Sequence, residues 1–393
     1  MPRLESSRAR WRVTALSHLV NDLHAQFVQV FTPLLAARLG LSLGQAGALT
    51  SLGGVMHMVV QPVAGYLSDR SGNNHLIVGG MLAAGFFSFL IPLASNFATA
   101  LAFVFLWGLG TACFHPQAQG AASYSARPEE LSRSISLFSF GGMLGSSLSP
   151  LYGVFMYQTF SPAILPLAGL AIPLLAAAAV VRVVPRVKDP ASEPSGLRRL
   201  PNKLANMFGR IWPVWCVTFL RDTTCKALSF LLPLLVALRG GDLTQVGTEL
   251  FFLTFFSALA PLALVRLWPS ARASRLLLFT LPIAAALLFV SRWLPLWTAV
   301  GAMSAASLFL TCSTPLVEVI AQSMAPNDRS TSSSLTMGLS FGAAGVMMTP
   351  LGFLAGRIGI EHALSLTALL PIAALGVVTF IWPRRIPGAA LGK

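Results

Sequence analysis

Uncharged segments long enough to cross a membrane recur through this chain of 393 residues. A helix needs about 20 mainly apolar residues to span the roughly 30 Å hydrocarbon core of a bilayer. Six runs without a charged residue are of about that length or longer: 39–68, 76–94, 97–126, 293–317, 330–356 and 362–383. Only 10% of all residues are charged, against about 25% in soluble domains. The sequence therefore excludes a water-soluble globular protein and predicts a helical membrane protein.

Six further spans complete the pattern. The segment 134–181 carries no charge over 48 residues, and a polar turn divides it into two spans. Residues 250–265 and 276–291 form two shorter apolar runs on either side of a basic turn. The remaining two, 12–37 and 211–238, contain charged residues near their middle. The sequence thus predicts an all-α membrane protein of twelve transmembrane helices, of which the first is too long and too polar to be a cleaved signal peptide.

The basic residues are unevenly distributed between the two predicted sides of the membrane. With the N-terminus in the cytoplasm, 21 of the 27 Lys and Arg fall in or beside cytoplasmic segments, and two lie within a span. The four that face outward are Arg38, Arg239, Arg292 and Arg357. Cytoplasmic loops of membrane proteins carry such an excess. We therefore interpret the net charge of +14 as a topology signal, not a nucleic-acid interface, and predict an inner (cytoplasmic) membrane protein with both termini in the cytoplasm.

An internal repeat relates the two halves of the chain. At an offset of 200 residues, positions 18–47 and 218–247 share nine of thirty residues without a gap. The shared residues include the pairs Asp22/Asp222, Pro33/Pro233, Gly40/Gly240, Gln45/Gln245 and Gly47/Gly247. Many transporters consist of two repeats with the substrate site between them near mid-membrane. We therefore predict two six-helix halves, 1–184 and 210–393, joined by a cytoplasmic linker at 185–209.

A short motif follows the second predicted span. Its residues, Gly65-Tyr-Leu-Ser-Asp69-Arg70-Ser-Gly72, resemble the G-x-x-x-D-R-x-G signature between the second and third helices of the major facilitator superfamily. Gly65 would allow close helix contact, Asp69 can face the N-terminus of another helix, and Arg70 can pair with a carboxylate. The resemblance implies that Gly65, Asp69, Arg70 and Gly72 form a cytoplasmic gate. A plain polar turn would explain Arg70 alone.

Two further motifs narrow this resemblance. Ser17-His18-Leu-Val-Asn21-Asp22 and Gly108-Leu-Gly110-Thr-Ala-Cys-Phe114-His115-Pro116 are similar to segments of the fosmidomycin-resistance group of efflux proteins within that superfamily. The resemblance implies the major facilitator fold and export of small compounds driven by the proton gradient, without a bound cofactor. Gln117 stands where the resemblance leads us to expect an acidic residue. We expect a monomer in the lipid bilayer that acts on a small-molecule substrate.

Ionisable residues in the first predicted span are the leading candidates for proton coupling. An ionised group at mid-bilayer costs about 2.5 to 3.5 kcal/mol, so it needs a partner or a water-filled cavity. His18 and Asp22 are one helical turn apart, and on a continuous helix Ala25 and Gln29 would extend the same stripe. We predict that His18 and Asp22 bind and release protons. Asn21 and Gln29 are predicted to contact the substrate.

The repeat places Asp222 of the seventh span at the position of Asp22. It has Arg221 beside it and Lys226 one turn further along. Asp222 either couples protons or forms an internal salt bridge with one of these cations. Arg221 and Lys226 suit an anionic or zwitterionic substrate, and Lys226 is the better candidate because it is not adjacent to the acid.

The fourth and tenth spans supply a second pair of polar motifs, His115-Pro116 and Thr314-Pro315. Each proline is expected to break its helix where the helix lines the transport cavity. We predict that His115 and Gln119 contact the substrate. Glu318 is the only acid of the tenth span and is predicted to carry protons or contact the substrate, with a packing hydrogen bond as the alternative.

These features predict a proton-coupled secondary transporter that exports a small anionic or zwitterionic compound or drug by alternating access. A proton symporter that imports a small solute would use the same residues and is the alternative. An intramembrane enzyme with His18, Asp22 and His115 as acid-base groups is less favoured, because the repeat has no role in it and no HExxH or GxSxG motif occurs. The four cysteines form no CxxC pair. We therefore predict no catalytic residue, no metal site and no disulfide.

Overall fold

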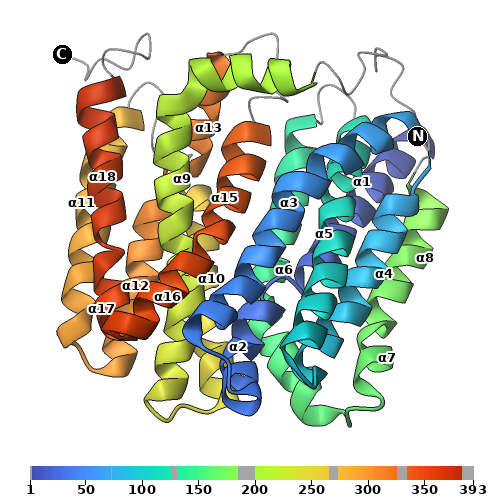
Figure 1. Cartoon of the computed structure of the whole chain (residues 1–393). Helices are drawn as coiled ribbons and strands as arrows, with labels where there is room; N and C mark the ends of the chain where they lie inside the picture. The colour runs from blue at the N-terminus through green and yellow to red at the C-terminus, as the bar shows by residue number, and fades with distance from the viewer. Residues whose placement is uncertain are drawn as a thin grey trace. The chain divides into compact units, whose positions relative to one another are not determined.

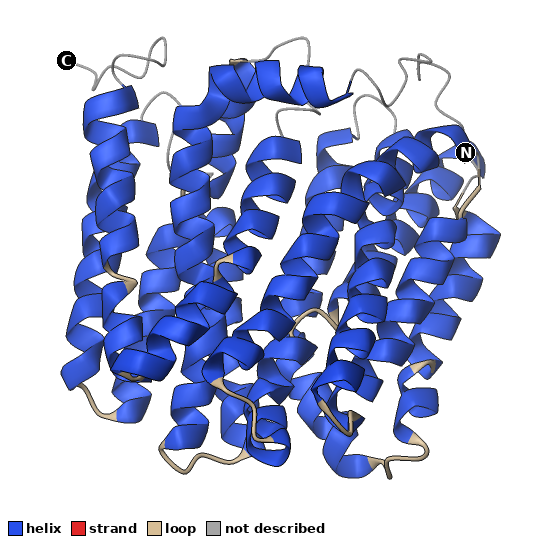
Figure 2. Ribbon diagram, viewed as in Figure 1, coloured by secondary structure: helices blue, strands red, loops and turns tan. Residues whose placement is uncertain are grey.

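The computed structural model describes residues 2–71, 73–125, 131–184, 200–264, 273–324 and 334–382. All regular elements in these ranges are helices, and no strand occurs within them (Figure 2). The chain divides into two compact units. Unit 1 contains Met1–Leu41, Val55–Glu193 and Gly241–Phe251, and unit 2 contains Ser42–Gly54, Pro194–Gly240 and Phe252–Lys393.

Unit 1 is a bundle of helices (Figure 1). Its helices are α1 (Pro2–Asp22), α2 (Phe27–Leu39), the later part of α3 (Leu43–Ser71), α4 (His75–Leu90), η1 (Ile91–Leu93), α5 (Phe97–Ser125), α6 (Leu131–Thr159), α7 (Leu165–Gly169) and α8 (Ala171–Val183). Helix α1 packs against α5, α6 and α8. Val20, Phe114 and Phe138 bring three of these helices into one buried apolar cluster, so the polar residues of α1 are held by apolar contacts on either side.

Unit 2 is arranged around α9 (Leu200–Leu238). Its other helices are the first part of α3, the later part of α10 (Leu243–Leu264), α11 (Ala273–Val290), η5 (Ser291–Trp293), α12 (Leu296–Thr311), α13 (Thr314–Ser323), the π-helix η6 (Ser334–Leu339), α15 (Ser340–Val346), α16 (Met348–Ile358), α17 (Ile360–Leu366), α18 (Leu369–Gly376) and the π-helix η7 (Val377–Ile381). Helix α9 packs against α12, α13, α15, α17 and α18. The two helices that the repeat relates, α1 and α9, therefore each pack against several helices of their own unit.

The repeat is visible in matching turns at equivalent positions. Gly40 ends α2 with a φ of 64°, and Gly240 follows α9 with a φ of 83°, a backbone conformation in which glycine avoids the strain of a Cβ. Both turns lead into a capping box. Gln45 exchanges hydrogen bonds with Ser42, and Gln245 exchanges them with Asp242. The paired Gly and Gln residues of the sequence thus carry the same local structure in both halves.

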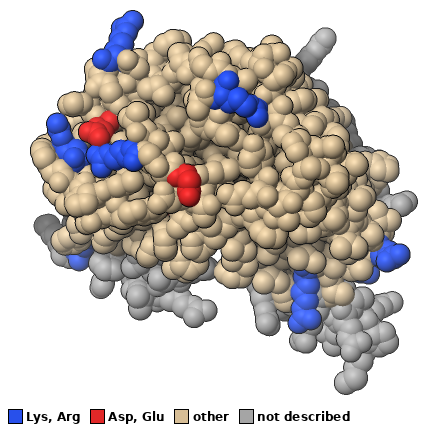
Figure 3. Space-filling model, turned by 90° about the horizontal axis from the view of Figure 1, so that it is seen from below, with Lys and Arg blue, Asp and Glu red and all other residues tan. Residues whose placement is uncertain are grey.

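Each predicted span corresponds to a helix or to consecutive helices. Seven helices within the described ranges are long and apolar enough to cross a membrane, and the count of twelve remains a prediction. Residues 185–199 of the predicted linker lie outside the described residues. Residues 200–209, the rest of the predicted linker, form the first turns of α9. On the face seen in Figure 3, charged side chains are sparse and scattered.

The first predicted span is wrong in one respect, because it is not a single helix. Helix α1 ends at Asp22 and α2 begins at Phe27. Side chains from other helices bond to backbone groups in the intervening turn: the indole Nε1 of Trp107 donates to the carbonyl of His24 at 3.1 Å, and the hydroxyl of Ser149 accepts from the amide of Gln26 at 3.0 Å. Gln29 consequently does not continue the stripe that begins at His18.

Pro116 and Pro315, which the sequence analysis paired, differ in their effect on the helix. Helix α5 continues through Pro116, so the predicted break is wrong there. Between α12 and α13 the helix is interrupted just before Thr314-Pro315. The first turn of a helix tolerates proline, because the missing amide would have no partner there.

Candidate functional site

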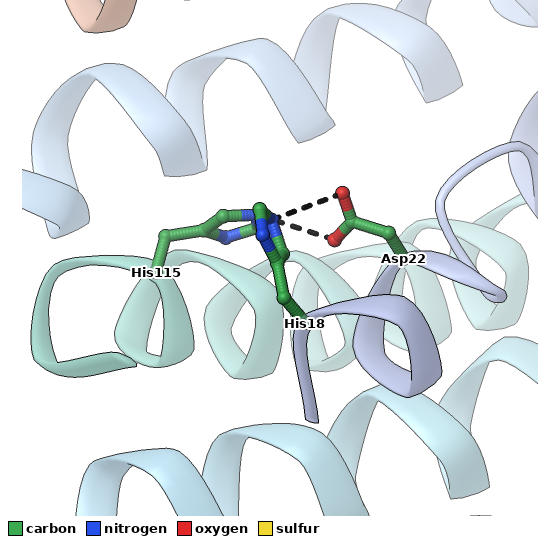
Figure 4. A group of neighbouring side chains, drawn as sticks. All are labelled: His18, Asp22 and His115. Atoms are coloured by element: carbon green, nitrogen blue, oxygen red, sulfur yellow. Dashed lines mark ion pairs between the residues drawn. The ribbon is translucent and has the colours of Figure 1, made fainter. Parts of the chain in front are cut away.

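In unit 1, the imidazoles of two histidines converge on the carboxylate of one aspartate (Figure 4). The Nε2 of His18 lies 3.3 Å from one oxygen of Asp22, and the Nε2 of His115 lies 3.2 Å from the other. His18 and Asp22 share a face of α1, as the sequence predicted, whereas His115 comes from α5. The side chains of His18, Asp22 and His115 expose only 12%, 14% and 24% of their surface. We call these three residues the imidazole-carboxylate cluster.

The opposite nitrogens of the two imidazoles contact backbone carbonyls. The Nδ1 of His18 is 2.8 Å from the carbonyl oxygen of Phe138, and the Nδ1 of His115 is 2.7 Å from that of Thr111. Because a carbonyl oxygen can only accept, both Nδ1 atoms carry a hydrogen. Each ring is therefore neutral when its Nε2 is bare and positively charged when its Nε2 is protonated.

Helix α6 fixes the orientation of His18. The His18 ring stacks on Phe138 with 4.1 Å between ring centroids. Gly142, one turn further along α6, lies directly against the same ring, and a Cβ there would overlap it. The neighbouring Gly141 and Gly145 lie equally close to the backbone of α1 at Ala15 and Leu19. The glycines of α6 thus allow α1 to approach closely enough for His18 to reach Phe138.

Further polar groups surround the cluster. The amide nitrogen of Asn21 donates to Asp22 at 3.0 Å, and Ser146 of α6 lies 3.4 Å from its other oxygen. The ring of His57, on α3, lies 5.8 Å from that of His115. His57 does not align with the polar residues of the other predicted spans, yet the fold places it beside the cluster. His24 instead points its Nδ1 at the carbonyl of Val20, at 3.0 Å, and is fully buried among aromatic rings.

The cluster also has ligand types that metals use. The ligand atoms of His18, Asp22 and His115 lie within 4.8 Å of one another, and no other group of this kind occurs in the described part of the chain. The contacts of 3.2 and 3.3 Å between nitrogen and oxygen have the length of hydrogen bonds. Donor atoms around one metal ion have similar separations, so the absence of a metal site stays a prediction.

The equivalent acid of unit 2 has a different partner. Arg221 donates to one oxygen of Asp222 from both Nε, at 3.0 Å, and a terminal nitrogen, at 2.8 Å. Ser340 of α15 donates to the other oxygen at 2.6 Å. The side chains of Arg221 and Asp222 expose 8% and 13% of their surface. Of the two cations that the sequence offered to Asp222, the structure pairs it with Arg221.

Glu318 belongs to the same polar region. The hydroxyl of Thr336 donates to Glu318 at 2.6 Å, and the Ser340 hydroxyl lies 2.6 Å from the Thr336 carbonyl. Asp222 and Glu318 are thereby connected through two residues of the segment 334–340.

Lys226 has an aromatic neighbour. Its ammonium nitrogen lies 3.7 Å from the centre of the Phe341 ring, a cation-π contact. Within the described residues, no carboxylate oxygen lies within 4.0 Å of this nitrogen. Lys226 therefore forms no ion pair with a carboxylate among the described residues, in contrast to Arg221.

The remaining predicted residues are placed less centrally. Gln29 is buried in α2, and Gln119 is exposed on α5. At Gly65 a Cβ would lie 3.5 Å from Pro116, which is an ordinary contact. Gly72 lies outside the described residues, and of Asp69 and Arg70 only the backbone, in α3, is described. The gate therefore remains a prediction.

Sequence reasoning missed Glu249 and gave Gln117 no role. Glu249 of α10 is fully buried, and neither of its carboxylate oxygens has a hydrogen-bond partner within the described residues. The only signal was an acid directly before the predicted span 250–265, at the position equivalent to Leu49. Gln117, where an acid was expected, accepts from the amide of Ile77 at 3.0 Å and donates to the carbonyl of Asn73 at 2.8 Å. Its side chain therefore fastens the start of α4 to α5.

Comparisons with known proteins agree with the motifs. The family model of the Major Facilitator Superfamily matches residues 14–347. An uncharacterized MFS-type transporter of Bacillus subtilis (strain 168), YfnC, is 25% identical over 407 residues, covering 94% of this chain and 92% of that protein. The fosmidomycin resistance protein of Escherichia coli (strain K12) is 33% identical over 138 residues, covering 35% and 34% of the two chains. These matches confirm the resemblance that the motifs predicted.

A solved structure shares the fold across nearly the whole chain. It is a bacterial homolog of the human lysosomal transporter Spinster, in an inward-facing and occupied conformation. The TM-score is 0.74 at 15% identity, over 96% of this chain and 97% of that one. At this level of identity the similarity concerns the fold alone.

Proposed function

Because the chain belongs to the Major Facilitator Superfamily, we propose that this multi-pass membrane transporter is driven by protons and exports a small anionic or zwitterionic organic compound from the cytoplasm. It works as a monomer in the cytoplasmic membrane, without a bound cofactor. The observation that carries the proposal is the position of Asp22 between the Nε2 atoms of His18 and His115.

The hydrogen-bond pattern of the cluster supports a proton-binding role. Since both Nδ1 atoms carry a hydrogen, each Nε2 without a proton would present a lone pair to a carboxylate oxygen. Two acceptors 3.2 or 3.3 Å apart repel each other unless a proton lies between them. The cluster therefore favours binding of protons, and histidine exchanges them near neutral pH. Loss of the proton between an Nε2 atom and Asp22 would destabilise the close contact of the two side chains. Protonation and the local structure of the cluster therefore depend on each other.

The charges of unit 2 support an anionic or zwitterionic substrate. Arg221 is satisfied by Asp222, whereas Lys226 has an aromatic ring and no carboxylate within 4.0 Å among the described residues. A buried ammonium group is stabilised by any anion that reaches it. The name of the fosmidomycin resistance protein supports export of a drug-like compound, and fosmidomycin itself is a suitable first probe.

Purified protein in sealed vesicles with a pH-sensitive dye inside tests the proposal directly. Addition of a substrate on one side, with no other gradient, should move protons in the opposite direction across the membrane. Fosmidomycin, other phosphonates and small carboxylates are the first compounds to add. An imposed pH gradient should in turn drive accumulation of the same compound.

The direction of transport has its own test in living cells. Cells that overproduce the protein should tolerate more of an exported toxic compound than cells that lack it. Increased sensitivity would instead favour the alternative, a proton symporter that imports the compound. Substrate movement that is indifferent to the pH gradient would contradict proton coupling in either direction.

A further inference from the structure

A groove on unit 2 is lined by none of the polar residues of the candidate functional site. It has a volume of about 890 Å³ and lies along α11, η5, α17 and α18, with the last residue of α16 at one side. These helices are neighbours in the fold (Figure 1). The groove therefore belongs to one unit and is formed entirely by its own helices.

Small side chains account for the groove. Ala285 and Ala286 of α11 line it, and α17 and α18 are separated by a turn at Thr367 and Ala368. Large apolar side chains flank this space and remain exposed: Phe289 by 51%, Leu369 by 57% and Ile372 by 51%. In a chain that spans a membrane, such surfaces are in contact with acyl chains.

One end of the groove is polar. Arg292, in η5, follows the last turn of α11, and His362 lies in the first turn of α17. The guanidinium of Arg292 lies 4.9 Å from the centre of the Trp293 ring. Tryptophan and arginine side chains of this kind gather where the hydrocarbon core meets the headgroups.

The charge at this end has no acidic partner among the residues that the structure describes. No carboxylate lies within 4.0 Å of Arg292 among the described residues. The nearest acid in sequence to His362 is Glu361, and it is held by Arg239 at 2.7 Å. An apolar groove that ends at a cation without an acidic partner is complementary to a molecule with a hydrocarbon chain and an anionic head.

We propose that this groove binds an anionic phospholipid. One acyl chain lies along α11 and α18, and the phosphate group accepts hydrogen bonds from Arg292. Basic residues between transmembrane helices bind lipid headgroups in this manner, and a guanidinium pairs well with phosphate oxygens. The lipid is a component of the outward-facing leaflet under the topology that the basic residues predict.

Native mass spectrometry of protein taken from bilayers with equal amounts of phosphatidylglycerol and phosphatidylcholine tests the proposal. Wild-type protein should retain phosphatidylglycerol in preference. Arg292→Gln should weaken that binding about tenfold, the effect of losing one charge-assisted contact. Arg357→Gln is the matched control, because Arg357 is exposed in the last turn of α16 but does not line the groove, and it should bind like wild type.

A second variant tests the groove without changing charge. Ala286 is exposed, so Ala286→Trp adds bulk without disturbing the core and should release phosphatidylglycerol although Arg292 is intact. Equal retention of the two lipids by wild type would overturn the proposal. So would equal losses in Arg292→Gln and Arg357→Gln, or undiminished binding in Ala286→Trp. None of these outcomes depends on proton coupling, so the proposed function is tested separately.

Discussion

Asp22 and Asp222 occupy equivalent positions of the repeat, but their partners differ in kind. In unit 1 the carboxylate lies between two imidazoles, one from its own helix and one from α5. In unit 2 it receives two hydrogen bonds from the adjacent arginine. An imidazole gains and loses its charge near neutral pH, whereas a guanidinium stays charged.

This difference gives the two copies of one helix different acid-base surroundings. Asp222 has a partner whose charge is permanent. Asp22 has partners whose charge is variable, and we propose that Asp22 is therefore the exchangeable acid of the two.

The largest expected effect follows from removing the exchangeable acid. Asp22→Asn should reduce substrate accumulation driven by a pH gradient to the level of vesicles without protein, because the amide cannot take up a proton in its place. Exchange of labelled for unlabelled substrate should persist. Full gradient-driven accumulation in this variant would show that Asp22 is not the coupling residue.

Loss of the permanent partner should instead affect folding. Arg221→Gln leaves a buried carboxylate with a serine alone, and breaking such a pair typically costs about 3–5 kcal/mol. The amount of folded protein and the unfolding temperature in detergent should fall. The double variant Arg221→Gln/Asp222→Asn should recover most of the loss, because no charge is left unpaired. Without this recovery, Asp222 would have a role beyond its pairing with Arg221.

Lys226 tests whether the unneutralised charge of unit 2 selects substrates. Lys226→Gln should lower transport of anionic compounds about tenfold and change that of neutral ones by less than about twofold, since only an anion loses a charge-assisted bond. Initial rates for matched acid and amide compounds measure this ratio. Equal losses for anionic and neutral compounds would show that Lys226 only packs against the Phe341 ring.

The smallest effects should come from the serines that contact the two acids. Ser340→Ala removes a bond of 2.6 Å to Asp222, yet Arg221 remains, so stability should fall by only about 0.5–1.5 kcal/mol. Ser146→Ala removes a longer contact of 3.4 Å to Asp22 and should cost less. Thermal unfolding of both variants measures the difference. A larger cost for Ser146→Ala would mean that hydroxyl groups, not imidazoles, stabilise Asp22.

Local patterns in the sequence were sufficient for part of this structure. The spacing of His18 and Asp22 on one helix face placed a contact that the structure contains, and the structure pairs Asp222 with Arg221, one of the two cations that the sequence offered. The Gly40/Gly240 pair likewise marked two equivalent turns. Each of these features depends on residues within one or two helical turns, where helix geometry determines which side chains meet.

Features that depend on distant residues could not be derived in this way. The turn between α1 and α2 is supported by Trp107 and Ser149, which lie far along the chain. The contact of His115 with Asp22 requires the packing of α5 on α1. The burial of Glu249 likewise results from tertiary packing. No periodicity or spacing encodes such contacts, so the sequence offered His115 as a candidate without its contact to Asp22, and did not single out Glu249, Trp107 or Ser149.

The glycines of α6 have a consequence for how this protein can vary. Every single-base change in a glycine codon that alters the residue introduces at least a Cβ atom. At position 142 that atom would overlap the His18 ring, and at positions 141 and 145 it would overlap the backbone of α1. Any single-base change that alters one of these three glycines would therefore disturb the packing of α6 on α1. The geometry around Asp22 thus depends on the codons of three residues on a neighbouring helix.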